Sequence, residues 1–489
     1  MRRYVIALLL SLFTLSTSFA QETTENIKGA ACLVSDDQGR VLVTHDILNN
    51  RISIPGGYVD SDNPADAAIR ETLEETGIPV IAVGELTRMG NAILFDCQAT
   101  SSIPVANTQY NKAAVAAWEA EHFGREVRAV YMMKPNQEML DNARFPEQVK
   151  LFPTLLESAT SSPIESLDDF SALASPFTVW NAGLNRGFQQ AVLALPAPTA
   201  TVLIKLLDNS SALGSGVLFF LLIPLAMATG GIKRAAEVLF VTIVATVIVT
   251  FGKLYFGVPR PFYVFPDLQL SGASGFAFPS GHTATAFAVW GLVYSWIKQS
   301  GRRATLAIWL VPATLVALSR VYLGVHYVTD VIAGAVVGVL VILLAQPLSQ
   351  RMLSSRLWLT MGALCVPFAL TQIQPLFLYC TAFSFAFAAV SYLSKYPPEQ
   401  SSVPMRAKGF VVSFTGVALL AAALYVVSQV SRSSIEILLS NTLGMVILAI
   451  WLGWGTLKWG SKARSTKAES SKAECSKAGF SKAKSSKTR

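Results

Sequence analysis

Apolar runs of membrane-spanning length dominate the second half of the chain, whereas the first part mixes apolar and polar positions in short alternations. A helical run of about 20 apolar residues matches the thickness of a bilayer core. The sequence therefore predicts an all-α polytopic transmembrane bundle. About nine spans are expected, at 212–230, 236–256, 281–298, 304–320, 327–347, 357–375, 378–394, 409–430 and 435–457.

The polar first part has the pattern of a soluble α/β domain. Ala30–Val34 and Val41–Thr44 alternate on either side of a polar turn and predict two strands. Ala65–Thr76 predicts a helix that stops at Gly77. A further helix is expected over Ala113–Glu121.

The two ends of the chain differ from both parts. Arg2 and Arg3 precede an apolar run that closes at Ser18-Phe19-Ala20, which is typical of an export signal, either cleaved or kept as an anchor. The last residues repeat Ser-Lys-Ala and lack apolar side chains for a core, so we expect a disordered tail. This tail either contacts anionic lipid heads or is simply solvated. The predicted parts are a signal or anchor at 1–20, a soluble domain at 25–150, a connector at 151–180, a membrane domain at 181–350, additional spans at 351–460 and a tail at 461–489.

Composition rules out a single soluble globule, because 52% of the 489 residues are hydrophobic and only 14% are charged. The net charge of +8 would suggest a polyanionic partner, but this value sums over segments whose own net charges have opposite signs. Residues 21–170 hold 11 Lys or Arg against 23 Asp or Glu, whereas residues 461–489 hold 9 against 2. No nucleic-acid partner is therefore expected.

Lys and Arg also predict the orientation of the spans. They gather in alternate short loops, which the positive-inside rule places in the cytoplasm. The soluble domain is then periplasmic, and the tail is cytoplasmic, in a multi-pass protein of a bacterial inner membrane. The oligomeric state stays open. In the exported domain, Cys32 and Cys97 fit either one disulfide or two buried thiols.

Polar side chains inside the membrane section are costly and usually functional. Three groups of them fall at the predicted outer ends of spans: Lys253 with Arg260, Ser280-Gly281-His282, and Arg320 with His326 and Asp330. Three cations suit a phosphoryl group, and a helix start at Ser280 and Gly281 favours an anion. His326 and Asp330 are four residues apart, so the carboxylate can orient the imidazole. His282 can then act as the general acid, and no metal is expected at this site.

These residues resemble the type 2 phosphatidic acid phosphatase superfamily, whose pattern Lys-x6-Arg-Pro, Pro-Ser-Gly-His, Ser-Arg-x5-His-x3-Asp is kept in full. The resemblance covers about 180–350 and implies that His326 is a phosphohistidine nucleophile and His282 the acid. It also implies that Lys253, Arg260 and Arg320 bind phosphate. The last four spans exceed the family pattern, and the sequence suggests no function for them.

The soluble domain carries a second pattern, in which Glu71, Glu74 and Glu75 share one helix face. Three carboxylates repel one another unless a hard cation such as Mg²⁺ or Mn²⁺ lies between them. The stretch resembles the Nudix box, with Asp62 in place of its first Glu and Thr72 in place of an aliphatic residue. The resemblance covers about 27–135 and implies an α/β sandwich with Glu71, Glu74 and Glu75 as metal ligands. The other box residues are Gly56, Asp62, Arg70 and Gly77.

Together the patterns predict a two-part membrane hydrolase. One part would remove phosphate from a lipid phosphate or diphosphate, with undecaprenyl diphosphate favoured and phosphatidylglycerol phosphate or phosphatidic acid next. The other would cleave a diphosphate bond with Mg²⁺ or Mn²⁺. The alternative is a membrane transporter or scaffold with one or both sites inactive, for instance an acidic, solvated helix face in place of the metal site. His45 and His122 match neither pattern and are expected to be surface or packing residues.

Overall fold

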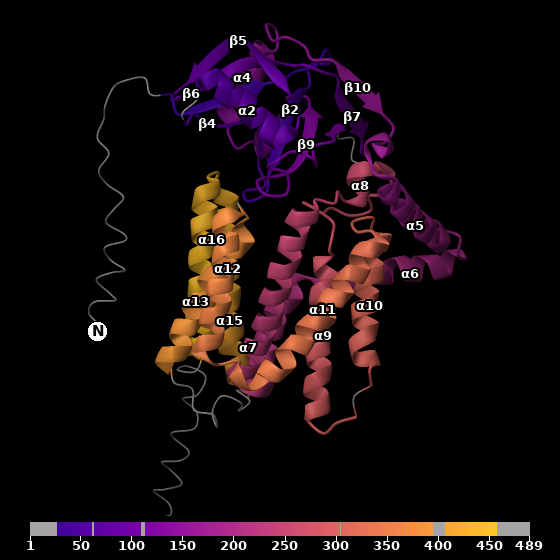
Figure 1. The fold of residues 1–489 in the computed structure, drawn as a ribbon, viewed down its shortest axis with the longest axis vertical. Helices are drawn as coiled ribbons and strands as arrows, with labels where there is room; N and C mark the ends of the chain where they lie inside the picture. The colour runs from indigo at the N-terminus through magenta and orange to yellow at the C-terminus, as the bar shows by residue number, and fades with distance from the viewer. Residues whose placement is uncertain are drawn as a thin grey trace, which may run out of the picture.

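A β-rich N-terminal domain lies over one end of a set of long helices (Figure 1). The computed structural model describes residues 27–60, 63–108, 113–303, 305–372, 374–394 and 406–456. The predicted signal at 1–20, the box residue Asp62 and the predicted tail at 461–489 lie outside the described residues. The two-part architecture agrees with the expected α/β region followed by a helical region.

Two sheets form the framework of the N-terminal domain. The four-stranded sheet has the order β4 (Gly56–Tyr58), β1 (Gly29–Leu33), β6 (Ala92–Ala99) and β5 (Val80–Met89). The six-stranded sheet has the order β10 (Ile164–Leu167), β7 (Ile103–Asn107), β8 (Ala113–Val115), β9 (Val127–Met133), β2 (Val41–Asp46) and β3 (Ile52–Ser53). Strands β1 and β6 are parallel, with Ala31 opposite Leu94, and β2 is antiparallel to β9. The short helices α3 (Gln137–Asn142) and α4 (Pro146–Leu155) follow β9.

Helix α2 (Pro64–Thr76) forms where the sequence predicts it, because both of its ends carry strong local signals. Asn63 caps the first turn by accepting a hydrogen bond from the backbone of Asp66, and Pro64 begins the helix. Gly77 ends it in the left-handed conformation, which a residue without a side chain adopts at little cost. The atypical Thr72 is buried, and its hydroxyl donates to the carbonyl of Ala68, so the polar group is satisfied within the helix.

The prediction of a helix over Ala113–Glu121 is wrong. Ala113–Val115 forms β8 instead, which pairs with β7 on one side and β9 on the other. The alanines favour a helix locally, but strand pairing in the middle of a sheet overrides a weak propensity. The residues that follow form turns, in which Trp118 packs edge-on against Phe170 in the core.

Long apolar helices make up the C-terminal part. The principal ones are α5 (Pro176–Leu193), α6 (Ala197–Ser210), α7 (Gly216–Phe256), α9 (Gly281–Gln299), α10 (Ala307–Tyr322), α11 (Val328–Leu348), α12 (Ser355–Thr371), α13 (Pro375–Ser394), α15 (Arg406–Val430) and α16 (Ser434–Ile450). Short elements between and beside them are α8 (Pro261–Val264), η1 (Ser171–Leu173), η2 (Ser211–Gly214), η3 (Pro266–Leu268), η4 (Ser349–Arg351) and η5 (Trp451–Gly455).

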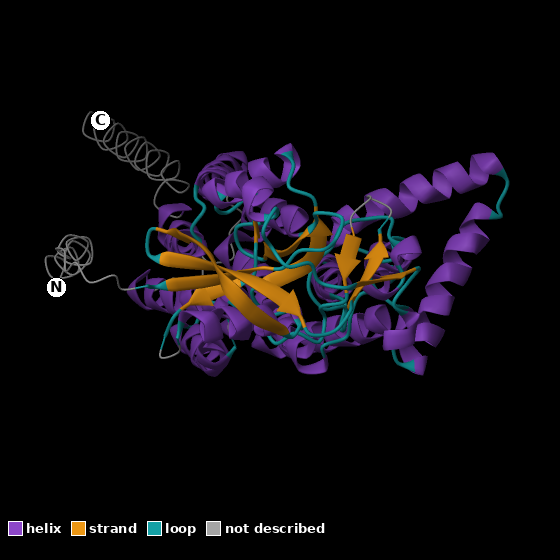
Figure 2. Cartoon of the chain, turned by 90° about the horizontal axis from the view of Figure 1, so that it is seen from above, coloured by secondary structure: helices purple, strands orange, loops and turns teal. Residues whose placement is uncertain are grey.

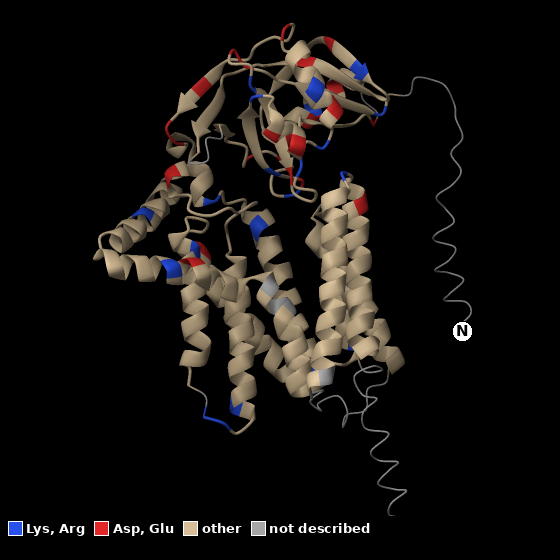
Figure 3. Ribbon diagram, turned by 180° about the vertical axis from the view of Figure 1, so that it is seen from behind, with Lys and Arg blue, Asp and Glu red and all other residues tan. Residues whose placement is uncertain are grey.

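Among the described residues, five helical segments are long and apolar enough to cross a membrane, and α10 and α12 are apolar but shorter. Helix α7 has non-helical backbone at Gly230 and Gly231, so its two halves correspond to the first two predicted spans. Charged residues lie mainly towards the ends of these helices, as a bilayer requires (Figure 3). A membrane protein is thus supported, and the count of nine spans stays a prediction.

The N-terminal domain and the helices share one hydrophobic cluster. Phe123 packs edge-on against Phe276 and Tyr263, with ring centroids 5.5 and 5.4 Å apart. The hydroxyl of Tyr263 donates to the backbone carbonyl of Arg128 at 2.8 Å. Because these contacts are apolar and buried, the domain is held in one position over the helix ends.

Cys32 on β1 and Cys97 on β6 form a disulfide, one of the two arrangements that the sequence left open. Both residues are fully buried between paired strands, and 65 positions of sequence separate them. A disulfide that closes so long a loop restricts the unfolded chain considerably.

We predict that replacing both cysteines, Cys32→Ala with Cys97→Ala, lowers the unfolding free energy of the N-terminal domain by about 2–5 kcal/mol. Thermal unfolding of the full chain in detergent, followed by the signal of the β-rich domain, measures the change. Wild-type protein treated with a reductant is the control and should melt like the variant. Equal melting of variant and oxidised wild type would contradict the prediction.

Candidate active sites

The first group of predicted site residues converges at the ends of four helices that lie nearest the N-terminal domain. Arg260 directly precedes α8, Arg320 lies in the last turn of α10, and His326 lies two residues before α11. The other members are Lys253 in the last turn of α7, Ser280, Gly281 and His282 at the start of α9, and Asp330 in the first turn of α11. The charges of Lys253, Arg260 and Arg320 act on both imidazoles. The structure therefore brings together all eight residues that the sequence selected.

His326 is 1% exposed and is held from two sides. Nη1 of Arg260 lies 3.2 Å from Nε2 of His326, and Oδ2 of Asp330 lies 3.4 Å from Nδ1. A guanidinium has only donors, so Nε2 must accept the hydrogen bond and the ring proton must lie on Nδ1, facing the carboxylate. The lone pair of Nε2 therefore points towards the guanidinium of Arg260.

Arg260 is fixed before any substrate arrives. Its guanidinium donates to the carbonyls of Ser274, Gly275 and Val325 at distances of 2.7 to 3.0 Å. The side chain is 4% exposed, and these carbonyls offset part of the cost of burying the charge. A preorganised donor of this kind loses little entropy when it binds an anion.

Arg320 has unused hydrogen-bonding capacity in the same space. Its Nη1 donates to the hydroxyl of Ser211 at 2.6 Å, while its buried Nε has no partner in the described structure. A buried donor without a partner is costly unless a ligand supplies the acceptor. An incoming phosphate oxygen would provide that acceptor.

Close packing of α9 against α11 sets the position of the site. The backbone N–H of Ser280 donates to the carbonyl of Asp330 at 3.0 Å, which ties the two helix starts together. A Cβ atom on Gly334 would lie 2.5 Å from the carbonyl oxygen of Ser280. Only glycine permits this approach, so the small residue brings the loop before α9 next to His326.

Sequence reasoning missed the contribution of α5. The amide of the fully buried Asn185 donates to the carbonyls of Val321 and His326, both at 2.9 Å. Gln189, one turn later, donates to the carbonyl of Tyr322 at 2.7 Å. These amides hold the backbone of the His326 loop, and only their polarity in an otherwise apolar helix could have signalled that role.

Helices α5 and α6 extend away from the other helices as an open V (Figures 1 and 2). They expose large apolar side chains, among them Phe177, Trp180, Leu193 and Val202. Exposed aromatic and aliphatic side chains beside a bundle suit the boundary between lipid heads and tails.

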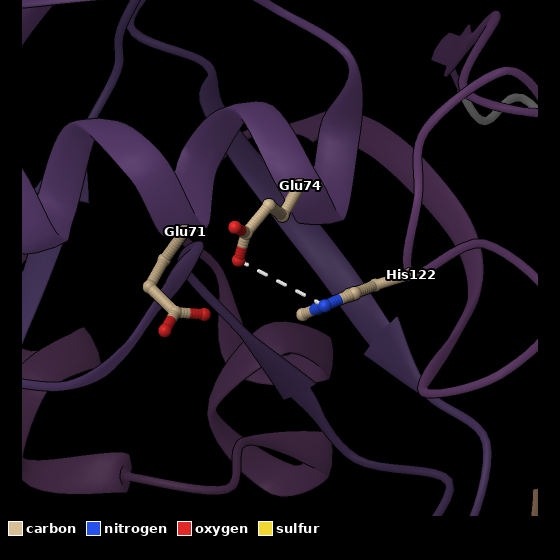
Figure 4. A group of neighbouring side chains, drawn as sticks. All are labelled: Glu71, Glu74 and His122. Atoms are coloured by element: carbon tan, nitrogen blue, oxygen red, sulfur yellow. Dashed lines mark ion pairs between the residues drawn. The ribbon is translucent and has the colours of Figure 1, made fainter. Parts of the chain in front are cut away.

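The second site lies in the N-terminal domain on α2. One ligand atom each from Glu71, Glu74 and His122 lies within 4.8 Å of the others (Figure 4). Nη1 of Arg70 donates to both carboxylates at 2.9 Å, so the arginine orients the pair. Two oxygen donors and one nitrogen donor fit Mg²⁺ or, better, Mn²⁺.

Glu75, the third predicted ligand, lies outside this three-residue cluster. Its carboxylate accepts a hydrogen bond from the backbone N–H of Gly56 at 3.2 Å. Burial raises the pKa of Glu75 well above its usual value, and the nearby Glu71 carboxylate raises it further. Burial also raises the pKa of Glu71, against the opposing effect of Arg70. A bound cation would favour the ionised form of these clustered carboxylates, so their raised pKa values support a metal ion at this site.

His122 was expected to be a surface or packing residue, but the structure places it beside Glu74, which makes it a further candidate ligand. Its Nε2 lies 3.8 Å from Oε2 of Glu74, and its backbone N–H donates to the carbonyl of Glu74 at 2.8 Å. The residue comes from the turns after β8, far from the box in sequence, so no local spacing could reveal it. His45, by contrast, bonds the carbonyl of Asn50 and joins neither site.

The comparisons with known proteins match both parts of the chain. A family model described as PAP2 superfamily matches residues 234–352, and one described as NUDIX domain matches residues 25–148. The chain is 38% identical over 93 residues to phosphatidylglycerophosphatase B of Bacillus subtilis, covering 18% of this chain and 46% of that protein. It is 37% identical over 83 residues to the bacitracin transport permease protein BcrC of Bacillus licheniformis, covering 17% and 38%. The chain thus spans less than half the length of these relatives.

Two solved structures are also similar in part. Aquifex aeolicus LpxE is 27% identical, with a TM-score of 0.29, over 34% of this chain and 94% of that one. A UDP-X diphosphatase is 11% identical, with a TM-score of 0.20, over 32% of this chain and 74% of that one.

We predict that His122→Ala weakens Mn²⁺ binding by about tenfold or more, because the imidazole either binds the ion or holds Glu74 in place. Titration of the full chain with Mn²⁺, read by electron paramagnetic resonance, measures the affinity. His45→Ala, which removes an imidazole distant from the cluster, is the control. Unchanged Mn²⁺ affinity in His122→Ala would exclude the histidine from the metal site.

Proposed function

We propose that this chain, in which a NUDIX domain precedes a PAP2 superfamily domain, is a membrane hydrolase of phosphate esters and anhydrides. Its membrane site would remove phosphate from a lipid phosphate or diphosphate. The observation that carries this proposal is the placement of His326, with Nε2 facing Arg260 and Nδ1 facing Asp330. A buried, oriented imidazole beside three cations suits covalent phosphoryl transfer.

In the proposed reaction, Nε2 of His326 attacks phosphorus and the bond from phosphorus to the leaving oxygen breaks. His282 gives a proton to that oxygen, and Asp330 stabilises the positive charge that develops on His326. Lys253, Arg260 and Arg320 bind the phosphoryl oxygens, with the backbone N–H group of Gly281 at the start of α9. Water then attacks the phosphohistidine, His282 takes the water proton, and phosphate leaves.

The proposed substrates are lipids with a phosphate or diphosphate head. Undecaprenyl diphosphate is the leading candidate, because a domain for diphosphates occurs in the same chain. Phosphatidylglycerol phosphate follows, and the name of the matched Bacillus subtilis protein supports it. Phosphatidic acid is the third candidate.

We further propose a multi-pass protein of the bacterial inner membrane, with nine spans, both sites periplasmic and the tail cytoplasmic. The distribution of Lys and Arg in the loops supports this orientation. The Cys32–Cys97 disulfide supports it independently, because disulfides persist in the periplasm and are rare in the cytosol.

The NUDIX domain is proposed as a diphosphate hydrolase. Glu71, Glu74 and His122 would hold Mg²⁺ or Mn²⁺, which supplies charge neutralisation of the diphosphate and a lower pKa for bound water when present. Glu75 lines the same pocket outside that cluster, so it is placed to accept the proton of the attacking water. Arg70 keeps the carboxylates oriented.

We predict that phosphate release from a lipid diphosphate persists in EDTA, which silences the proposed metal-dependent NUDIX site. In EDTA, release should fall by about 10³-fold or more in His326→Ala, because the nucleophile is lost. Asp330→Asn should lower kcat by about 10²- to 10⁴-fold, since the imidazole loses its orienting carboxylate. A malachite green assay on purified protein measures both. Asp267→Asn, at an exposed ion pair with Arg186, is the control. Equal release by wild type and His326→Ala would instead favour the transporter or scaffold alternative.

We predict the opposite metal response for the NUDIX site. In the His326→Ala protein, hydrolysis across a panel of soluble diphosphates should require Mg²⁺ or Mn²⁺ and disappear in EDTA. Glu74→Gln should lower the rate by about 10²-fold or more, because it removes a charged ligand. Product analysis by mass spectrometry measures the turnover. The exposed Glu119→Gln should match its parent, and activity that persists in EDTA would disprove the metal-dependent mechanism.

A further inference from the structure

A cavity of about 1250 Å³ lies between the NUDIX domain and the tips of α12, α13 and α16. Glu71, Glu75 and His122 line it on one side. The end of α12 and the beginnings of α13 and α16 line it on the other. The proposed metal site therefore does not face open solvent alone, because membrane helices form part of its wall.

The wall formed by the helices is largely apolar. Leu370, at the end of α12, is 81% exposed, and Ile435, at the beginning of α16, is 57% exposed. Leu378 and Leu438 line the cavity beside them. Because these side chains stand at the membrane end of the cavity, they offer a surface for an apolar group that comes from the bilayer.

The opposite wall carries the polar chemistry. Gly57 lies against the Glu71 carboxylate so closely that a Cβ atom would overlap it. Arg125, Arg144 and Arg432 also line the cavity and can bind phosphate oxygens that the metal ion does not contact. Arg432 belongs to the loop between α15 and α16, so the helices supply a charge as well as an apolar surface.

Hydrogen bonds fix the two walls relative to each other. The hydroxyl of Ser434 donates to Asp46 and accepts from the amide of Asn49, both at 2.8 Å. Arg51 donates to the carbonyl of Gln429 at 2.9 Å, and Gln374 donates to the carbonyl of Gly124 at 3.0 Å. These hydrogen bonds therefore hold the helix tips in place as one wall of the cavity.

We propose that this cavity binds the diphosphate of a long-chain lipid alcohol embedded in the membrane. The diphosphate would lie at Glu71, Glu74 and His122, and the first part of the chain would lie against Leu370, Leu378 and Ile435. The inference rests on the proposed hydrolase function of the NUDIX domain and names its substrate class. It also gives a role to the helices beyond the PAP2 pattern. Three of them, α12, α13 and α16, line the cavity, and Gln429 at the end of α15 accepts a hydrogen bond from Arg51.

The reaction is a hydrolysis that balances without a further reactant. Water attacks one phosphorus, the bridging P–O bond breaks, and the lipid monophosphate and phosphate are released with one proton. The lipid monophosphate belongs to the substrate class proposed for the membrane site. The NUDIX domain would then supply the substrate that the PAP2 domain consumes.

Chain-length selectivity tests the proposal in the His326→Ala protein, reconstituted in nanodiscs with Mn²⁺. The substrates are a C15 and a C5 prenyl diphosphate, and mass spectrometry measures the monophosphate products. We expect kcat/KM to be about tenfold or more higher for C15 than for C5. The double substitution Leu370→Ser with Ile435→Ser should lower that ratio by about fivefold or more, because it removes apolar surface. Leu376→Ser is the matched control, since Leu376 lies in the first turn of α13 but does not line the cavity.

The ratio of kcat/KM for C15 to that for C5 is the readout, because partial unfolding would lower both kcat/KM values together. A ratio unchanged by the double substitution overturns the proposal. If the wild-type NUDIX site hydrolyses neither these substrates nor any soluble diphosphate with Mn²⁺ or Mg²⁺, the proposed hydrolase function itself fails. Soluble diphosphates hydrolysed without either prenyl substrate would overturn only the substrate class.

A second measurement avoids substitutions in the cavity. A C15 diphosphate with a photoreactive group at its chain end should label peptides from 355–378 or 434–450, and unlabelled C15 diphosphate should compete. Labelling confined to the NUDIX domain would overturn the proposal.

Discussion

The structure around the membrane site depends on the burial of a compact group of charges at the helix ends. Arg260, His326 and Asp330 are each at most 4% exposed. A buried charge is tolerable only where partners replace the lost hydration, and removing one partner leaves the others uncompensated. The carbonyls that surround Arg260, the amides of α5 and the close contact of α9 with α11 all serve that requirement. A phosphate can enter this group because the positive charge of the three cations is greater than the negative charge of the single carboxylate.

A single turn region connects the two domains and both candidate sites. His122 lies at the NUDIX cluster, while the next residue, Phe123, packs on Phe276 beside the loop that holds Arg260. Gly124 follows, and its carbonyl accepts from Gln374 at the tip of the last helices. Three neighbouring residues therefore contact the candidate metal cluster, the segment next to the Arg260 loop and the additional helices. The proposed handling of one lipid by both domains in turn requires such a fixed arrangement.

Much of the local structure could be predicted because its signals are short-range. Asn63, Pro64 and Gly77 mark the ends of α2, and the spacing of Glu71 and Glu74 places both on one helix face. The strands β1 and β2 follow from alternation. The same reasoning predicted a helix over Ala113–Glu121, where pairing with β7 and β9 formed a strand instead. It also assigned His122 no role, because the residue reaches Glu74 only through the turns that follow that strand.

The sequence by itself determined the two chemistries, because both rest on short-range spacing. The three carboxylates lie on successive turns of α2, and His326, just before α11, is four residues from Asp330 in the first turn of that helix. It also determined that long apolar segments follow an acidic domain. Only the tertiary structure decided that Asn185 holds the His326 loop and that the tips of α12 and α16 close the NUDIX cavity. These contacts join residues more than 100 positions apart. Their physical basis is the packing of whole helices and sheets, which no local pattern of side chains encodes.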